Sequence, residues 1–322
     1  MPFARTVLGD IAPEELGIVY AHEHLIIHGG RPIEYQADFD LSSVEKAVAE
    51  LAPAQALGLR TVVDAMPCDA GRDVLMLADI ARESGVNVIA PSGLHHERYY
   101  HDRHWSVRLS AEEIADLFVA DITEGIDELD YNGPVVKRTP HKAGVMKIAG
   151  STDGPSARDE PIFAAAGMAQ YRTGCPILTH CEHGTGALEQ VELLVEHGGD
   201  PAHIVLSHTD HVVDRAYMRD IAATGARVEY DQHMRTPKDQ PNGTLQLLEW
   251  AAEDDLLGHI TIGLDAARQK YWKQHGGSPG WAYLLAEFSD RMRNELTFGD
   301  AELRTLFVET PGGAYTFGTA HT

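Results

Sequence analysis

Short apolar runs alternate with longer amphipathic segments along almost the whole chain. Eight of these runs are nearly continuous in hydrophobicity, as strands buried on both faces of a parallel sheet are. They cover residues 17–20, 61–65, 86–90, 145–149, 176–179, 203–207, 227–230 and 260–263. Helical patterns lie between them at residues 42–57, 72–84, 111–128, 187–196, 214–224 and 244–253. This alternation predicts a parallel sheet covered by helices.

The number of strand–helix units decides between two architectures. Eight units favour a closed (β/α)8 barrel, the TIM barrel, over a doubly wound open sheet, which typically has about five or six strands. Long connections at residues 91–144 and 266–281 follow the third and eighth strands, at the carboxyl ends where barrel enzymes build their active sites. Because no linker or repeat interrupts the pattern, we expect residues 1–322 to form a single barrel domain.

The amino-acid composition indicates which binding partners and which cellular compartment to expect. The chain carries 49 Asp and Glu against 26 Lys and Arg, a formal charge of −23, so it repels nucleic acid and anionic lipid. We therefore expect a small-molecule substrate, with neither nucleic acid nor a membrane as partner. The first ten residues lack the apolar core of a secretory signal, and the 3 cysteines form no disulfide or metal-site pattern. These features predict a cytoplasmic protein.

Several of the 18 histidines lie where predicted strands end. His22 and His24 follow the first strand, and alternate residues of a strand project from the same face. His180 closes the fifth strand, His208 the sixth and Asp265 the eighth. Each residue alone has an ordinary structural explanation. Imidazoles and a carboxylate that follow apolar runs are together costly to bury, and a divalent metal would compensate that cost.

Lys147 lies inside the apolar fourth strand. Burial disfavours the charged ammonium and lowers its pKa. A neutral amine reacts with carbon dioxide to give a carbamate, an anion that can bridge two metals. The alternative is a barrel lysine paired with a nearby acid.

In their order and strand positions, these six residues resemble the phosphotriesterase-like family of the amidohydrolase superfamily. The resemblance implies a binuclear metal centre at the carboxyl-terminal face of a (β/α)8 barrel. It implies the following ligands: His22, His24 and Asp265 for the buried metal, His180 and His208 for the more exposed metal, and N-carboxylated Lys147, with a hydroxide, as the bridge. We expect zinc, while manganese, cobalt and iron stay open because imidazole and carboxylate ligands accept all four.

The chemistry that this centre implies is metal-assisted hydrolysis. Two divalent ions acidify the bridging water, and the more exposed ion polarises the carbonyl or phosphoryl oxygen of the substrate. Asp265 is the expected catalytic residue. It would take the proton as the hydroxide attacks and pass it to the leaving group.

The loop after the eighth strand, residues 265–272, resembles that of the phosphofuranose lactonase subgroup. The resemblance implies that Arg268, Tyr271 and a lysine from the loop after the seventh strand hold the substrate phosphate. In this chain Arg235 or Lys238 stands in that loop, and the sequence does not decide between them. Alternatively, Arg268 pairs with an acidic residue of the next helix.

The loop after the third strand departs from the family. Residues 94–101 are dense in histidine and charge, where many lactonases have an aromatic residue. We expect His95, or alternatively His96, to bind a polar hydroxyl group of the substrate. The alternative is a solvated loop without a specific role.

The leading hypothesis is a metal-dependent hydrolase that opens a sugar-derived γ-lactone, phosphorylated or otherwise anionic, by attack of the bridging hydroxide on the carbonyl. A phosphotriesterase, a carboxylesterase or an amide hydrolase with the same binuclear centre is the alternative. A non-catalytic barrel that binds a small molecule is disfavoured, since it has no chemical need of a bridging carbamate. Dimers are common among relatives, so the resemblance also suggests a homodimer.

Overall fold

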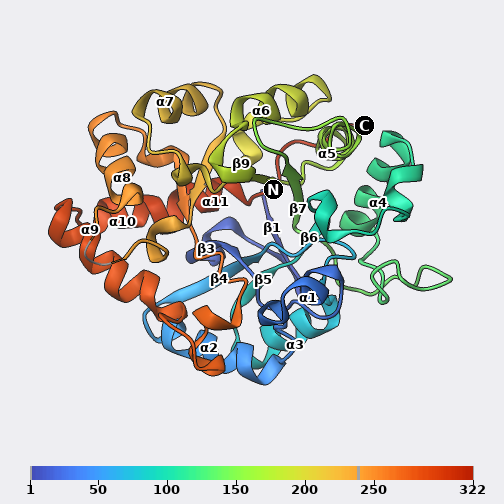
Figure 1. Cartoon of the computed structure of the whole chain (residues 1–322), viewed down its shortest axis with the longest axis horizontal. Helices are drawn as coiled ribbons and strands as arrows, with labels where there is room; N and C mark the ends of the chain where they lie inside the picture. The colour runs from blue at the N-terminus through green and yellow to red at the C-terminus, as the bar shows by residue number, and fades with distance from the viewer. Residues whose placement is uncertain (1, 238–239, 322) are drawn as a thin grey trace.

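The computed structural model describes residues 2–237 and 240–321, in which parallel strands occupy the centre and helices surround them (Figure 1). Seven barrel strands are single segments, and Ala90 divides the remaining one into two parts. The segments are β3 (Ile18–Glu23), β4 (Leu59–Asp64), β5 (Asn87–Ile89), β6 (Pro91–Gly93), β7 (Val145–Gly150), β8 (Ile177–Cys181), β9 (Ile204–Ser207), β10 (Arg227–Tyr230) and β11 (Ile260–Ile262).

The strands form a closed ring of eight positions. Parallel pairing runs from β3 through β4 to β5, and from β6 through β7, β8, β9 and β10 to β11. The third position changes partner at Pro91, which has no N–H to donate: β5 pairs with β4, whereas β6 pairs with β7. Next to β11, the Asp265 N–H donates to the His22 carbonyl at 3.0 Å across the seam with β3. The predicted (β/α)8 barrel is confirmed.

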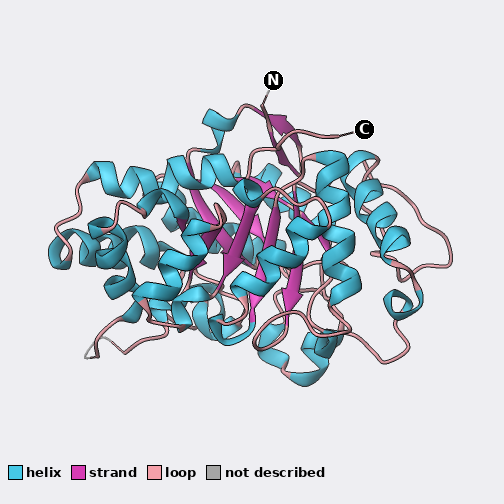
Figure 2. Ribbon diagram, turned by 90° about the horizontal axis from the view of Figure 1, so that it is seen from above, coloured by secondary structure: helices cyan, strands magenta, loops and turns pink. Residues whose placement is uncertain are grey.

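Helices cover the outside of the strands (Figure 2). Several of them begin at polar caps: Ser43 caps α2, Asp73 caps α3 and Ser110 caps α4. The helices are α1 (Arg31–Tyr35), α2 (Val44–Ala56), α3 (Val74–Ser84), α4 (Ala111–Thr123), α5 (Glu160–Thr173), α6 (Ala187–Glu196), α7 (Arg215–Ala223), α8 (Gly243–Glu253), α9 (Ser289–Glu295), α10 (Asp300–Arg304) and α11 (Thr310–Ala314). None of the helices in the described ranges is long and apolar enough to cross a membrane.

The barrel interior has its own apolar cluster. Val19, Val63, Val145 and Val205 project into it from four different strands and are fully buried. Tyr315, which follows α11, fills the same interior, and its hydroxyl donates to the Ala21 carbonyl at 2.7 Å. Both chain termini lie together at one end of the molecule, near the antiparallel hairpin of β1 (Ala4–Thr6) and β2 (Gly9–Ile11) (Figure 2).

Two predicted segments end at least three residues away from the predicted position. The helix expected at residues 111–128 stops at Thr123, because Gly125 has a φ of +140° and lies against the backbone of Thr139, where a Cβ would be 1.9 Å from the carbonyl oxygen. The first strand extends to Glu23, so His22 lies within β3 and His24 directly after it.

Candidate metal centre

The residues expected to hold the buried metal lie together at the carboxyl ends of β3 and β11. Asp265 Oδ1 is 3.2 Å from His24 Nε2 and 3.8 Å from His22 Nε2. Both imidazoles are buried, and one ligand atom from each of the three residues lies within 4.8 Å of the others. Their Nε2 atoms therefore face the same carboxylate.

The two remaining histidines adjoin this group. The ring centroids of His180 and His208 are 4.6 Å apart, and those of His208 and His22 are 4.9 Å apart. His208 and Asp265 have positive φ values of 66° and 44°, a conformation that side chains with a Cβ rarely adopt. Such backbone strain clusters at functional sites, where the surrounding structure holds it in place.

Lys147 lies beneath these side chains on β7. It is fully buried, and its Nζ has no hydrogen-bond partner among the described residues. Gly93 of β6 packs directly against the Lys147 backbone, where a Cβ would lie 2.0 Å from the carbonyl oxygen. Burial lowers the pKa of Lys147 to about 8. This lower pKa makes the neutral amine, which carbamate formation requires, more accessible near neutral pH than in an exposed lysine.

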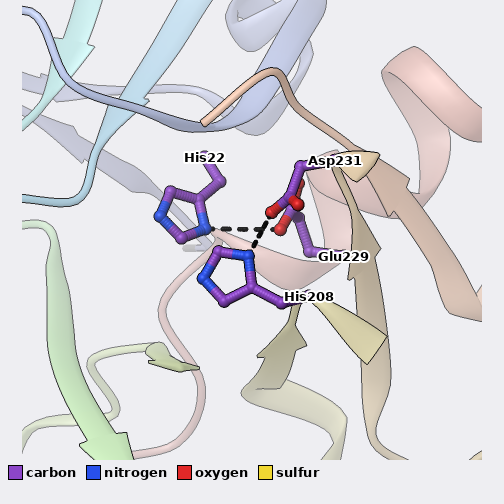
Figure 3. Close-up of side chains that lie close together, drawn as sticks. All are labelled: His22, His208, Glu229 and Asp231. Atoms are coloured by element: carbon purple, nitrogen blue, oxygen red, sulfur yellow. Dashed lines mark hydrogen bonds and ion pairs between the residues drawn. The ribbon is translucent and has the colours of Figure 1, made fainter. Parts of the chain in front are cut away.

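Two carboxylates on β10 and directly after it orient the histidines (Figure 3). His22 Nδ1 lies 3.3 Å from Glu229 Oε2 and 3.0 Å from Ser207 Oγ, and His208 Nδ1 lies 2.5 Å from Asp231 Oδ2. In both rings Nδ1 is occupied and Nε2 is left for a metal. Imidazole ligands of metals usually donate their second nitrogen to such a carboxylate or carbonyl.

Sequence reasoning missed Glu229 and Asp231, although a signal was present. The two acids stand two residues apart at the end of an apolar strand, a spacing that directs both side chains to one face. The buried group His22, His208, Glu229 and Asp231 could itself hold an ion by distance alone. Its imidazole nitrogens, however, already contact its carboxylates, so we interpret it as the support of the neighbouring ligands.

The donor set fits divalent metal ions. Burial lowers the pKa of His22 and lowers that of His180 to about 3, so both imidazoles are neutral, the form that binds metals. Asp265 adds a carboxylate whose pKa is lowered: burial acts to raise it, but Arg235 and His24 outweigh burial. The unpartnered Lys147 amine beneath them completes the set.

A cavity of about 370 Å³ opens above this centre. Five of the expected ligands, namely His22, His24, His180, His208 and Asp265, line its floor. Its walls come from the loops that follow β3, β4, β6, β10 and β11.

The residues expected to bind substrate are distributed around this cavity. Arg268 and Tyr271 both line it. Arg268 Nη1 lies 3.5 Å from Asp38 Oδ2, and its guanidinium carbon lies 4.5 Å from the centroid of the Phe39 ring. The acidic partner of Arg268 thus comes from the segment after β3 and not from the next helix. Sequence reasoning missed Lys270, which also lines the cavity.

Arg235 and His95 occupy different positions around the cavity. Arg235 lines it, but its Nη2 donates to Asp265 Oδ2 at 2.5 Å and to the Asp265 carbonyl at 2.9 Å. Lys238 lies outside the described residues. His95 is buried at the cavity wall, with its ring centroid 5.5 Å from that of His180 and its ring edge-on to Tyr99.

Comparison with known proteins places this geometry in a family. Residues 2–315 match the sequence profile of the Phosphotriesterase family. The chain belongs to this family. A phospho-furanose lactonase of Mycoplasmopsis synoviae is 38% identical over 299 residues, which cover 89% of this chain and 84% of that protein.

Solved structures agree with this assignment. The crystal structure of an amidohydrolase from Mycoplasma synoviae matches with a TM-score of 0.92 and 32% identity, covering 99% of this chain and 93% of that chain. That of a lactonase from Listeria monocytogenes matches with a TM-score of 0.89 and 27% identity, covering 98% of this chain and 100% of that chain.

Membership of the phosphotriesterase family confirms the predicted reaction class. The family comprises hydrolases of ester bonds that use a binuclear metal centre, and this chain has the buried ligand cluster. The protein is therefore a metal-dependent hydrolase of lactones or esters.

Proposed function

We propose that this phosphotriesterase-family protein is a lactonase that opens an anionic, phosphorylated sugar γ-lactone. The observation that carries the proposal is the composition of the cavity. Its floor is the ligand cluster, and Arg268, Lys270 and Tyr271 form one of its walls. A substrate that places its carbonyl over the floor would direct a charged substituent toward that wall.

We assign the ligands that the family resemblance implies: His22, His24 and Asp265 for one ion, His180 and His208 for the other, and carboxylated Lys147 between them. When bound there, two zinc ions would acidify water and polarise the ester carbonyl.

Asp265 is the group that we assign to proton transfer. Arg235 holds one of its carboxylate oxygens, while the other faces His24. The lowered pKa of Asp265 keeps it ionised, because Arg235 and His24 outweigh the effect of burial. Asp265 can therefore accept a proton from the attacking water at a fixed position and deliver it to the alkoxide that leaves the lactone ring.

Arg268 and Lys270 supply positive charge in a protein whose formal charge is −23. The contact of Arg268 with Asp38 is 3.5 Å long, and both side chains are about one-third exposed. An ion pair of this kind contributes little, so a phosphate that forms shorter charge-assisted hydrogen bonds can displace Asp38. A neutral phosphotriester would gain nothing from these cations.

Relatives add independent support. The Mycoplasmopsis synoviae relative bears the name phospho-furanose lactonase, and the Listeria monocytogenes structure is that of a lactonase. Both similarities extend over most of the chain, including the loop after β11 that carries Arg268.

A substrate panel tests the proposal. The zinc-loaded protein is assayed against phosphorylated aldonolactones, their unphosphorylated counterparts and a neutral phosphotriester. We expect kcat/KM to be highest for a phosphorylated lactone, by about tenfold or more over the unphosphorylated one, since a charge-assisted contact of about 1.5–3 kcal/mol is added. Faster turnover of the neutral phosphotriester would instead support a phosphotriesterase.

A further inference from the structure

The charged loop after β6 has a contact that the proposed mechanism does not use. We propose that the ion pair between Arg98 and Glu182 is a positioning device that orients His180 in the metal centre and fastens the loop after β6 to it. This inference rests on the proposed metal centre and assigns to it two residues that do not themselves bind metal.

Glu182 contacts both His180 and Arg98 and so links them. It follows β8 directly, and its side chain is only 13% exposed. Its Oε2 lies 2.7 Å from His180 Nε2. Its two oxygens also accept hydrogen bonds from Arg98, at 3.0 Å from Nη1 and 3.0 Å from Nη2.

The contact with Glu182 decides which nitrogen of His180 faces the centre. With Nε2 donating to the carboxylate, Nδ1 is the nitrogen left for a metal. His22 and His208 show the opposite arrangement, in which Nδ1 contacts a carboxylate and Nε2 is left. Each of these three histidines thus has a carboxylate partner of its own, and Glu182 is the partner of His180.

Arg98 holds the carboxylate of Glu182 in place. A bidentate guanidinium–carboxylate contact fixes the plane of the carboxylate, which a single hydrogen bond does not. Arg98 belongs to the short helix Glu97–Tyr99 and also lines the cavity above the centre. The ion pair therefore connects the cavity wall to a residue at its floor.

The other end of this loop segment is fastened independently. The Tyr100 hydroxyl donates to the Cys68 carbonyl at 2.9 Å and accepts from the His95 N–H at 2.7 Å. Loss of the Arg98 contact should therefore leave the loop folded and release mainly the carboxylate of Glu182. This separation allows the positioning role to be tested without unfolding the loop.

The test measures metal binding by metal-free protein and does not depend on turnover. Wild type and the variants Glu182→Ala, Glu182→Gln, Arg98→Met and Glu97→Gln are titrated with Co²⁺, followed by visible absorption and by competition with a chelator. Glu97→Gln is the matched control, because Glu97 is an exposed carboxylate of the same loop that pairs with Arg158 at 3.4 Å.

We expect Glu182→Ala to weaken one of two Co²⁺ sites by about 10- to 100-fold and to alter its absorption band, with the other site unchanged. Glu182→Gln should restore most of the affinity, because its amide oxygen can still accept from His180 Nε2. Arg98→Met should weaken the same site by up to about fivefold. Adding Arg98→Met to Glu182→Ala should have no further effect, since Arg98 acts through Glu182.

Two results would overturn the inference. One is a Glu182→Ala protein that binds both Co²⁺ ions with the affinity and spectrum of wild type. If that variant does not fold, Arg98→Met provides the test instead. A Co²⁺ affinity of Arg98→Met equal to that of Glu97→Gln would then contradict the inference. Wild-type protein that binds fewer than two Co²⁺ ions would instead contradict the proposed metal centre itself.

Discussion

At the scale of the residue, Lys147 has an environment that a simple structural lysine does not explain. Its amine is fully buried and has no partner among the described residues, although Asp265 and Glu229 act to raise its pKa against the larger effect of burial. A buried polar group without a partner costs about 1–3 kcal/mol, and a charged one costs more. Carboxylation would replace the unpaired amine with an anionic group that metals can bind.

Replacing Lys147 by alanine should remove the bridge between the metals. We expect the metal content of the variant to fall from two ions per chain to one or none, measured by elemental analysis after zinc-supplemented expression. Urea unfolding of the metal-free proteins provides the control, because a folded Lys147→Ala protein separates metal loss from misfolding. A variant with full metal content and full activity would contradict the carbamate assignment.

His233 gives a prediction about pH. It is fully buried against the face of Phe288, with ring centroids 4.1 Å apart, and its Nε2 donates to the Gly263 carbonyl at 2.8 Å. Burial lowers its pKa to about 4, against about 6.5 in an unfolded chain. Between these values the unfolded state binds a proton that the folded state excludes, so the contribution of His233 to stability falls as the pH falls.

A His233→Phe variant lacks this proton uptake. The loss of unfolding free energy caused by His233→Phe should be about 2 kcal/mol smaller at pH 5 than at pH 8. The reason is that pH 5 lies about 1.5 units below the unfolded pKa of about 6.5, and each unit corresponds to about 1.4 kcal/mol. Urea unfolding of metal-free wild type and variant at the two pH values measures the difference. An unchanged cost would mean that His233 is not excluded from protonation in the folded state.

At the scale of the element, the loop after β11 determines the proposed substrate class. Arg268→Met should raise the KM for a phosphorylated lactone by about 10- to 100-fold, because a charge-assisted contact of about 1.5–3 kcal/mol is lost. It should leave the KM for the unphosphorylated lactone within about twofold. Lys273→Met is the matched control, since Lys273 is an exposed cation of the same loop that does not line the cavity. Equal KM values for wild type and Arg268→Met would exclude Arg268 from phosphate binding.

The strand positions, and the grouping of the candidate ligand residues at the strand ends, could be predicted from the sequence because both depend on local pattern. All eight apolar runs overlap barrel strands, and an ionisable residue at the end of an apolar run is visible without any structure. Helix α5 was not among the predicted helices. Its middle, from Phe163 to Gly167, is a continuous buried run, so its sequence lacks the regular polar stripe that marks an amphipathic helix.

Contacts between distant segments could not be predicted. Glu182 stands beside His180 in the sequence, but its partner Arg98 is 84 positions away, and only the folded barrel brings them together. Arg268 and Asp38 are also far apart in the sequence, and only the fold brings them into contact. Side-chain chemistry shows which residues are able to pair, whereas the closure of the barrel decides which of them do.

At the scale of the whole molecule, the barrel gathers at one end residues that are spread over the whole sequence. The proposed ligands run from His22 to Asp265, and parallel strands bring their carboxyl ends to the same face. The formal charge of −23 describes the surface as a whole, whereas Arg98, Arg235, Arg268 and Lys270 line the cavity. The net charge of the chain is therefore a poor guide to the charge of its substrate.

The most direct test of the proposed metal centre is to measure hydrolytic activity while metal is added. Metal-free protein is given increasing amounts of zinc, and hydrolysis of a phosphorylated lactone is measured against the number of ions bound per chain. We expect negligible activity without metal and a rise that levels off at two ions per chain. Full activity in metal-free protein, or a plateau at fewer than two ions per chain, would contradict the proposed metal centre.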